Sequence, residues 1–299
     1  MPSKRLQLLL LRSPTMPSRK FQFPLLIFFF ILSALSLLRL LRITFKTSSK
    51  TPFPPTIHPK PLLTCTNLPP NISHTLITHQ SSSLPYAHGQ LTHKELCFLL
   101  TLISTRTPMN LLVFGMRHQA PLLAALNSGG QTVFLEEMSS VEVARLRFQG
   151  LRIHKVEHGQ LVAEAYDLLR RARGRAACGF RGTLRDSECE LAMRGLPREV
   201  YKRKWDMVVV DGPDGSRLDA AGRMAAIYSA GVLARMGSNL TKVTDIVVHD
   251  VDRTVERWYS WEFLCEENLA SAKGRFWHFR IKASVSSVFC SNSDAHADH

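Results

Sequence analysis

Acidic residues are absent from the first 60 positions of this chain, although the full 299 residues contain 24 Asp and Glu. Those 60 positions carry ten Lys and Arg, so ten of the 14 net positive charges lie there and residues 61–299 keep a net charge of +4. A protein that binds nucleic acid carries its positive charge on the folded surface. The nearly balanced remainder therefore argues against a nucleic-acid partner.

Two ligand-binding patterns are also missing. The chain has no Gly-x-Gly-x-x-Gly fingerprint, and none of its six cysteines forms a Cys-x-x-Cys pair, which argues against a zinc site. In an oxidising compartment Cys178 and Cys189 would close a short loop, whereas the alternative is that several cysteines are buried thiols. The six are Cys65, Cys97, Cys178, Cys189, Cys265 and Cys290.

An uncharged apolar run covers residues 21–38, between Lys20 and Arg39. A run of that length crosses a thin bilayer, so it predicts a transmembrane anchor. A cleaved signal peptide and an organellar transit peptide are the alternatives that the pattern leaves open. We expect a cytosolic tail, a membrane anchor and a Ser-, Thr- and Pro-rich stem over 1–20, 21–43 and 44–85.

The orientation of this anchor rests on weak signals. Positive charges flank both sides of the run, so their bias is slight. Two glycosylation sequons, Asn71-Ile-Ser73 and Asn239-Leu-Thr241, have meaning only if the C-terminal part lies in the lumen. They favour a lumenal domain.

Residues 86–282 alternate strand and helix patterns, and a disordered tail is expected over 283–299. Thr92-His-Lys-Glu95 is a capping box that predicts the start of a helix. The alternation predicts an α/β domain with a mostly parallel sheet and helices on both faces. Residues 174–204 interrupt it as an insertion or long loop. Strands are expected near 110–114, 132–135, 153–156, 205–211, 245–250 and 277–281, and helices over 121–127, 139–149, 160–173 and 222–235. The last strand, 277–281, is expected to be an antiparallel edge strand.

A glycine and several polar residues lie at the carboxyl ends of four of the expected strands. Because the carboxyl ends of parallel strands meet at one edge of a sheet, we expect these residues to surround one crevice. Glu136 lies about 20 residues after Gly115, the spacing at which a carboxylate reaches the ribose hydroxyls of a cofactor. The residues are Gly115, Glu136, Glu137, Asp211, His249 and Asp250.

Two of these residues are candidates for proton transfer. Asp211 either acts in the crevice or caps the Gly-Pro turn that follows it. His249 is either a general base, since its ordinary pKa suits neutral pH, or a structural hydrogen-bonding group. Arg223 opens a helix and either packs there or faces the crevice.

A series of motifs resembles the plant polysaccharide-biosynthesis family that contains the glucuronoxylan 4-O-methyltransferases and the irregular-xylem proteins of xylan formation. The resemblance covers about residues 85–281. Its members are type II Golgi proteins, which agrees with the anchor and the stem. The motifs are Asn110-Leu-Leu-Val-Phe-Gly115, Thr132-Val-Phe-Leu-Glu-Glu137, Leu196-Pro-Arg-Glu-Val-Tyr201, Trp205-Asp-Met-Val-Val-Val-Asp-Gly-Pro213, Gly222-Arg-Met-Ala-Ala-Ile-Tyr228, Val248-His-Asp-Val-Asp-Arg253 and Glu262-Phe-Leu-Cys265.

The resemblance implies a Rossmann-like, seven-strand methyltransferase fold that binds S-adenosylmethionine. Its implied cofactor residues are Gly115, His118, Glu136 and Glu137, and its implied catalytic residues are Asp211, His249 and Asp250. It also implies that Arg117 and Arg223 pair with a uronate carboxylate of glucuronoxylan. A divalent metal held by Asp211 and Asp250 is compatible with it.

The first loop departs from the family's methyltransferases, which read Phe-Gly-Leu-Gly-His-Asp-Ser where this chain has Phe114-Gly-Met-Arg-His-Gln-Ala120. Arg117 replaces a glycine and Gln119 replaces an acid, which adds bulk and charge where backbone approaches a cofactor. Two functions stay open: methyl transfer to O-4 of glucuronic acid, and non-catalytic support of xylan assembly alongside other xylan-synthesis proteins.

Overall fold

The computed structural model describes Ser33 and residues 91–115, 119–137, 150–173, 175–179, 182–236, 240–284 and 288–290. Of the predicted anchor over 21–43, only Ser33 falls within them, and the expected helix over 139–149 lies outside them. Within the described residues, no helix has both the length and the apolar character that crossing a bilayer requires. Apart from Ser33, the described residues belong to one compact unit, Leu62–His299.

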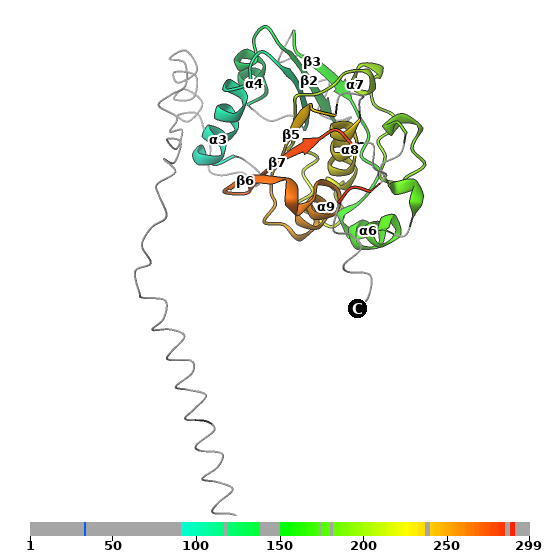
Figure 1. The fold of residues 1–299 in the computed structure, drawn as a ribbon. Helices are drawn as coiled ribbons and strands as arrows, with labels where there is room; N and C mark the ends of the chain where they lie inside the picture. The colour runs from blue at the N-terminus through cyan, green and yellow to red at the C-terminus, as the bar shows by residue number, and fades with distance from the viewer. Residues whose placement is uncertain are drawn as a thin grey trace, which may run out of the picture. The chain divides into compact units, whose positions relative to one another are not determined.

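A seven-stranded sheet forms the centre of this unit (Figure 1). Its spatial order is β3-β2-β1-β4-β5-β7-β6, in which β3 to β5 are parallel and β7 is antiparallel to both of its neighbours. The strands are β1 Asn110–Phe114, β2 Gln131–Glu136, β3 Arg152–Lys155, β4 Met207–Val210, β5 Val243–Val248, β6 Leu269–Lys273 and β7 Phe276–Lys282.

Helices cover both faces of the sheet because successive strand residues point to opposite sides. Leu111 and Val113 pack in the cluster that contains α3 and α4, whereas Leu112 and Phe114 pack in the cluster that contains α6, α8 and α9. In Figure 1, α3 and α4 lie on one side of the strands and α8 on the other. The predicted fold class, a Rossmann-like α/β domain with a mostly parallel sheet, is confirmed. The helices are α3 His93–Ser104, α4 Ala120–Leu126, α6 Ala165–Arg173, α7 Arg198–Lys202, α8 Met224–Arg235 and α9 Thr254–Leu264.

Several predicted element boundaries agree with local chemistry. The capping box is present: Oγ1 of Thr92 accepts from the amide of Glu95, and the Glu95 carboxylate accepts from the amide of Thr92. The helix expected over 160–173 begins as a short 3₁₀ turn, Val162–Glu164, and becomes α-helical only at Ala165.

The segment predicted as an insertion, 174–204, is short of regular structure but holds the 3₁₀ turns Ala176–Cys178 and Leu184–Asp186 and the helix α7. Cys178 and Cys189 form a disulfide across it, so that one of the two alternatives for these cysteines is confirmed. Both half-cystines are buried, together with Leu184 and Leu191. The segment therefore adds its own apolar residues to the core on the α8 side.

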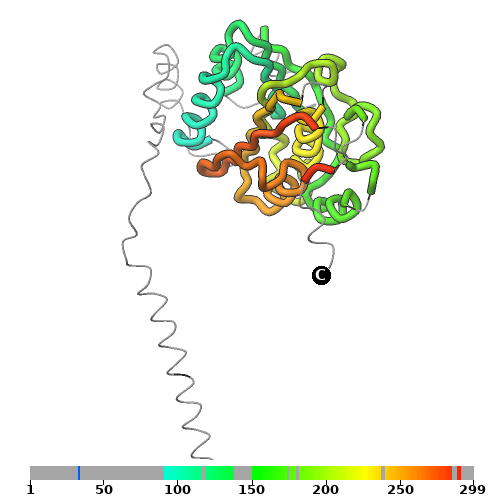
Figure 2. Tube along the Cα trace, in the orientation of Figure 1, coloured from blue at the N-terminus to red at the C-terminus, as the bar shows by residue number. Residues whose placement is uncertain are grey.

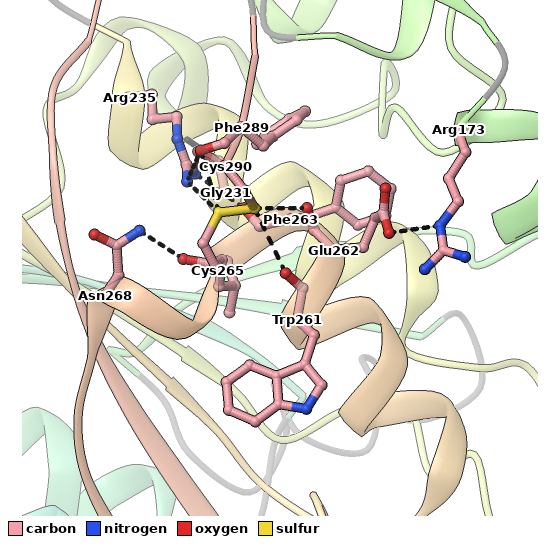
Figure 3. The surroundings of a disulfide bond; sticks show 11 residues. Arg173, Gly231, Arg235, Trp261, Glu262, Phe263, Cys265, Asn268, Phe289 and Cys290 are labelled. Atoms are coloured by element: carbon pink, nitrogen blue, oxygen red, sulfur yellow. Dashed lines mark hydrogen bonds and ion pairs between the residues drawn. A yellow bond between two sulfur atoms is a disulfide. The ribbon is translucent and has the colours of Figure 1, made fainter. Parts of the chain in front are cut away.

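The chain end differs from the predicted tail over 283–299. Cys290 forms a disulfide with Cys265, which follows α9, as Figure 3 shows. Arg235 of α8 holds the same segment: its guanidinium lies over the Phe289 ring and donates to the Phe289 carbonyl at 3.0 Å. In Figure 2 the last described segment, in red, runs beside the orange α9. Residues 288–290 are thus part of the domain.

The sheet continues beyond the strand that the sequence placed at its edge. β7 is antiparallel, as expected, but β6 pairs with its outer side, so the prediction of β7 as the edge is wrong. A register irregularity lies in β6 between Leu269 and Ser271. The 3₁₀ turn Glu266–Asn268 leads into it.

Candidate functional site

The four predicted strand tips do meet at one edge of the sheet. In the parallel register, Phe114 lies beside both Leu135 and Val210, and Val210 lies beside Val248. The residues that follow them along the chain, Gly115, Glu136, Asp211 and His249, therefore belong to the carboxyl edge, where open α/β sheets bind ligands.

Gly115 and Gly212 bring the backbones after β1 and β4 into close contact. Gly115 has φ of +88°, and a Cβ atom built on it would lie 2.6 Å from the Gly212 Cα. A side chain at position 115 would therefore force the backbone at Gly212 to shift. The connections after β1 and β4 are therefore packed directly against each other at this point.

Asp211, which directly precedes Gly212, forms a hydrogen-bonded pair with His249. Nδ1 of His249 lies 2.8 Å from Oδ1 of Asp211. Burial alone would lower the pKa of His249, but the carboxylates of Asp211 and Glu95 outweigh burial and raise it. The His249 ring is fully buried, whereas the Asp211 side chain is 7% exposed. Of the two, Asp211 is the group that can meet a ligand, and His249 orients it.

Asp250 is the centre of a buried ion-pair network, which does not agree with its predicted catalytic role. Its Oδ2 lies 2.8 Å from Arg223 and 3.0 Å from Arg253, and its Oδ1 lies 2.7 Å from Arg275. The Asp250 side chain is 0% exposed. Three arginines occupy its two oxygens, so Asp250 stabilises the edge and offers no oxygen to a divalent metal.

Arg223 takes part in the same network, and the uronate contact predicted for it needs correction. Its guanidinium donates to the carbonyls of Pro213 and His249 and to Asp250, each at 2.8 Å. The side chain is fully buried at the N-cap of α8. Arg223 therefore forms hydrogen bonds to the connections after both β4 and β5 and holds them together.

Two residues of the network, Glu95 and Arg275, were missed by the sequence analysis. Glu95 is 2% exposed and accepts from the backbone amide and guanidinium of Arg275. It also lies 3.8 Å from Nε2 of His249. These donors outweigh burial and hold the pKa of Glu95 well below its usual range. The capping box already explains a glutamate at this position, which is why its second role left no separate signal.

The carboxylates after β2 are the remaining predicted site residues. Glu136 and Glu137 are both half-buried, and the amide of Glu137 donates to the Glu136 carboxylate at 3.2 Å. Burial, and then the charge of Asp214, raise the pKa of Glu137. Asp214 follows β4, so this interaction brings the acidic groups after β2 and β4 within electrostatic reach across β1. Arg117 and His118 lie outside the described residues.

An apolar pocket opens beside Gly115 and Asp211. Its wall comes from α3, α4 and the strands, and Gln119 at the N-cap of α4 contributes a polar group. Among its apolar lining residues are Leu99, Leu123, Phe134 and Val209. Its volume is about 10 Å³, close to the minimum for one water molecule, so it is a gap in the core beside the candidate site and is too small for a cofactor.

The fold and the edge together define a Rossmann-like α/β domain with carboxylates at the carboxyl edge of its sheet. A family model described as IRX15/IRX15L/GXM matches residues 94–279, and the chain belongs to that family. The resemblance found in the sequence motifs is thereby confirmed.

Three relatives from Arabidopsis thaliana illustrate the similarity. Glucuronoxylan 4-O-methyltransferase 1 is 38% identical over 73% of this chain and 76% of its own length. Arabinogalactan O-methyltransferase 1 is 36% identical over 73% of this chain and 75% of its own length. Protein IRREGULAR XYLEM 15 is 34% identical over 71% and 67%.

Among solved structures, a putative caffeoyl-CoA O-methyltransferase from Staphylococcus aureus resembles this chain at a TM-score of 0.38 and 10% identity. The similarity covers 71% of this chain and 99% of that one. The family assignment rests on the sequence similarity and not on this structure.

Proposed function

We propose that this protein transfers a methyl group from S-adenosylmethionine to O-4 of glucuronic acid on glucuronoxylan or a related acidic glycan. The observation that carries the proposal is the 38% identity to a glucuronoxylan 4-O-methyltransferase, over about three quarters of both chains. Because arabinogalactan O-methyltransferase 1 is also a relative, arabinogalactan is the second candidate acceptor.

The residues of the carboxyl edge fit the cofactor in two respects. Gly115 turns the backbone after β1 at φ of +88° and lies against Gly212, at the edge of the sheet where the cofactor is expected. Glu136 follows at the tip of the neighbouring parallel strand, the position from which a carboxylate holds ribose hydroxyls. The cofactor supplies a methyl group activated by its bond to a sulfonium. His118 and Glu137 remain predicted cofactor contacts.

Asp211 is the residue that we assign to the acceptor hydroxyl. A hydroxyl oxygen becomes positively charged as it attacks a methyl group, so a nearby carboxylate stabilises that charge and accepts the proton. His249 holds the carboxylate in place through Nδ1 at 2.8 Å. We therefore reassign His249 from general base to positioning residue. Arg117 remains the predicted partner of the uronate.

We also propose a single-pass type II arrangement in the Golgi membrane, with the domain in the lumen and residues 21–43 as the anchor. The uncharged run in the sequence supports the anchor. The Cys178–Cys189 and Cys265–Cys290 disulfides support an oxidising compartment, because disulfides persist there and are rare in the cytosol.

The decisive experiment is a methyl-transfer assay on the full-length protein in membranes. The protein is incubated with isotope-labelled S-adenosylmethionine and unmethylated glucuronoxylan, and 4-O-methylglucuronate is scored by mass spectrometry. We expect Asp211→Asn to lower the rate by about 100-fold, because it removes the proton acceptor. Asp252→Asn, on the exposed connection after β5, should keep the wild-type rate within about twofold.

Cofactor binding separates this function from the alternative of non-catalytic support of xylan assembly. Arg117 and Gln119 favour that alternative, since they change the first loop. If the wild-type protein binds no S-adenosylmethionine at millimolar concentration in calorimetry and transfers no methyl group, the enzyme proposal is withdrawn in favour of the supporting role.

A further inference from the structure

Two aromatic side chains lie side by side on the surface. Tyr166 in the first turn of α6 is 62% exposed, and Trp258 in α9 is 41% exposed. Their ring centroids are 6.2 Å apart and the rings are tilted by 59°. Every other aromatic side chain among the described residues is buried or half-buried. Exposed aromatic residues that contact each other form a concentrated apolar surface, unlike scattered surface residues.

Two exposed leucines lie on the segment that leads into α6 and on the segment bonded to it. Leu161 is 41% exposed and Leu218 is 71% exposed. Their segments are joined by a β-bridge between Leu161 and Ala221 and by a hydrogen bond from the Ala163 amide to the Leu218 carbonyl at 3.0 Å. We call Leu161, Tyr166, Leu218 and Trp258 the aromatic patch.

The framework beneath the aromatic patch is held by hydrogen bonds between its three segments. The hydroxyl of Tyr259 in α9 donates to the carbonyl of Ala165 at 2.8 Å, which joins α9 to the start of α6. Arg253, before α9, donates to the carbonyl of Asp214 at 2.5 Å, which joins it to the connection after β4. The patch is therefore preorganised, and a ligand would not have to order it.

The position of the patch links it to the candidate site. Its residues come from the connections that leave the carboxyl ends of β3, β4 and β5 or from the helices that those connections enter. Asp211 begins the middle one of these connections. The patch therefore belongs to the side of the domain to which the carboxyl ends of the parallel strands point, as Asp211 does.

We propose that the aromatic patch is a binding subsite for the glycan chain, on which pyranose rings stack while one sugar reaches Asp211. The face of an aromatic ring is electron-rich and apolar, so it matches the C–H groups on the face of a sugar ring. An exposed Arg217–Asp219 pair lies on either side of Leu218 in the sequence and offers polar groups for sugar hydroxyls. The identity of the glycan rests on the proposed function.

A folded protein partner fits this surface less well. Stable protein interfaces take about 20–30 residues from each side, whereas the aromatic patch has four apolar side chains among charged ones. Small aromatic surfaces with nearby polar groups suit a ligand that is apolar on its faces and polar at its edges, as a sugar chain is.

Binding is tested with the full-length protein in detergent and xylo-oligosaccharides that carry glucuronic acid, without cofactor. We expect Tyr166→Ala and Trp258→Ala each to raise the Kd about tenfold, because each removes one stacking face. Tyr166→Phe and Trp258→Phe should stay within about threefold of wild type, since they keep the ring. Leu240→Ala is the matched control: Leu240 is 49% exposed but precedes β5 at the opposite edge of the sheet.

The outcomes separate this inference from the proposed function. Loss of oligosaccharide binding in the two alanine variants supports the subsite even if the protein transfers no methyl group. Unchanged Kd values in those variants overturn it even if methyl transfer is found, and so does a wild-type protein that binds no oligosaccharide. If light scattering instead shows that the alanine variants lose a dimer while binding the glycan normally, the patch joins two copies of the chain and the subsite is rejected.

Discussion

Nδ1 of His249 lies 2.8 Å from the carboxylate of Asp211, and the histidine ring is sealed from solvent. The pair joins the tips of β4 and β5, which are neighbouring strands. One residue of the pair borders the crevice and the other is buried behind it, so substitutions at the two positions affect different properties.

Replacement of His249 by glutamine should give a stability loss that depends on pH. The folded-state pKa of His249 lies above its ordinary value of 6.5, so folding favours the protonated ring. That contribution is complete below pH 6.5 and disappears as the pH rises through the raised pKa. Urea denaturation of wild type and His249→Gln, compared from about pH 5.5 to about pH 9, should show the largest difference at the acidic end. A difference that grows with pH would contradict the raised pKa.

Asp250→Asn should destabilise the domain severely. The substitution leaves Arg223, Arg253 and Arg275 without their shared anion, and removal of one partner of a buried pair costs about 3–5 kcal/mol. Asparagine tolerates the positive φ of 58°, so the backbone is not an additional cause. The exposed Asp252→Asn serves as the control, within about 0.5 kcal/mol of wild type in chemical denaturation. Equal losses in both variants would refute the role of Asp250 as the centre of the network.

Gly115→Ala should cost more than the same substitution at Gly129. The two glycines have nearly the same φ, +88° and +85°, so the backbone strain is matched at about 1 kcal/mol. Only at Gly115 does the new Cβ meet backbone, 2.6 Å from Gly212, whereas the nearest atom at Gly129 is 3.8 Å away. Overpacking adds about 1–3 kcal/mol, which thermal unfolding of the two variants measures as a difference in free energy. Matching losses would mean that the contact with Gly212 relaxes freely.

The two disulfides should differ in their contribution to stability in the order of their loop lengths. Cys178 and Cys189 are 11 residues apart, and Cys265 and Cys290 are 25 apart. Each should stabilise the domain by about 2–4 kcal/mol, with the longer loop contributing about 0.7 kcal/mol more. Denaturation of the double variants Cys178→Ala/Cys189→Ala and Cys265→Ala/Cys290→Ala compares them directly. The reverse order would show that packing around the sulfurs outweighs chain entropy.

The sequence predicted the sheet and the residues at its carboxyl edge because both depend on local patterns. Apolar runs that end in Gly115 or Asp211 define parallel strands, and parallel strands bring their ends together. β6 was missed because Leu-Ala-Ser-Ala-Lys has weak strand propensity and is stabilised by its pairing with β7.

The roles of the charged residues could not be read from the sequence in the same way. Asp250 and Arg223 resemble crevice residues by position, but their pairing depends on Arg253 and Arg275, which lie three and 25 positions beyond Asp250. Burial decides whether a charge meets a ligand or another side chain, and burial at a strand tip is set by the whole fold. Local spacing predicts where such a residue lies, not what it contacts.

The register irregularity in β6 has a consequence for how the protein behaves when it is concentrated. β6 is the outermost strand on its side, and an outer strand presents unpaired amides and carbonyls that another molecule can extend into a continuous, intermolecular ribbon. An irregular strand breaks the even spacing that such growth requires. At high protein concentration, this irregularity therefore disfavours fibrous self-association through β6.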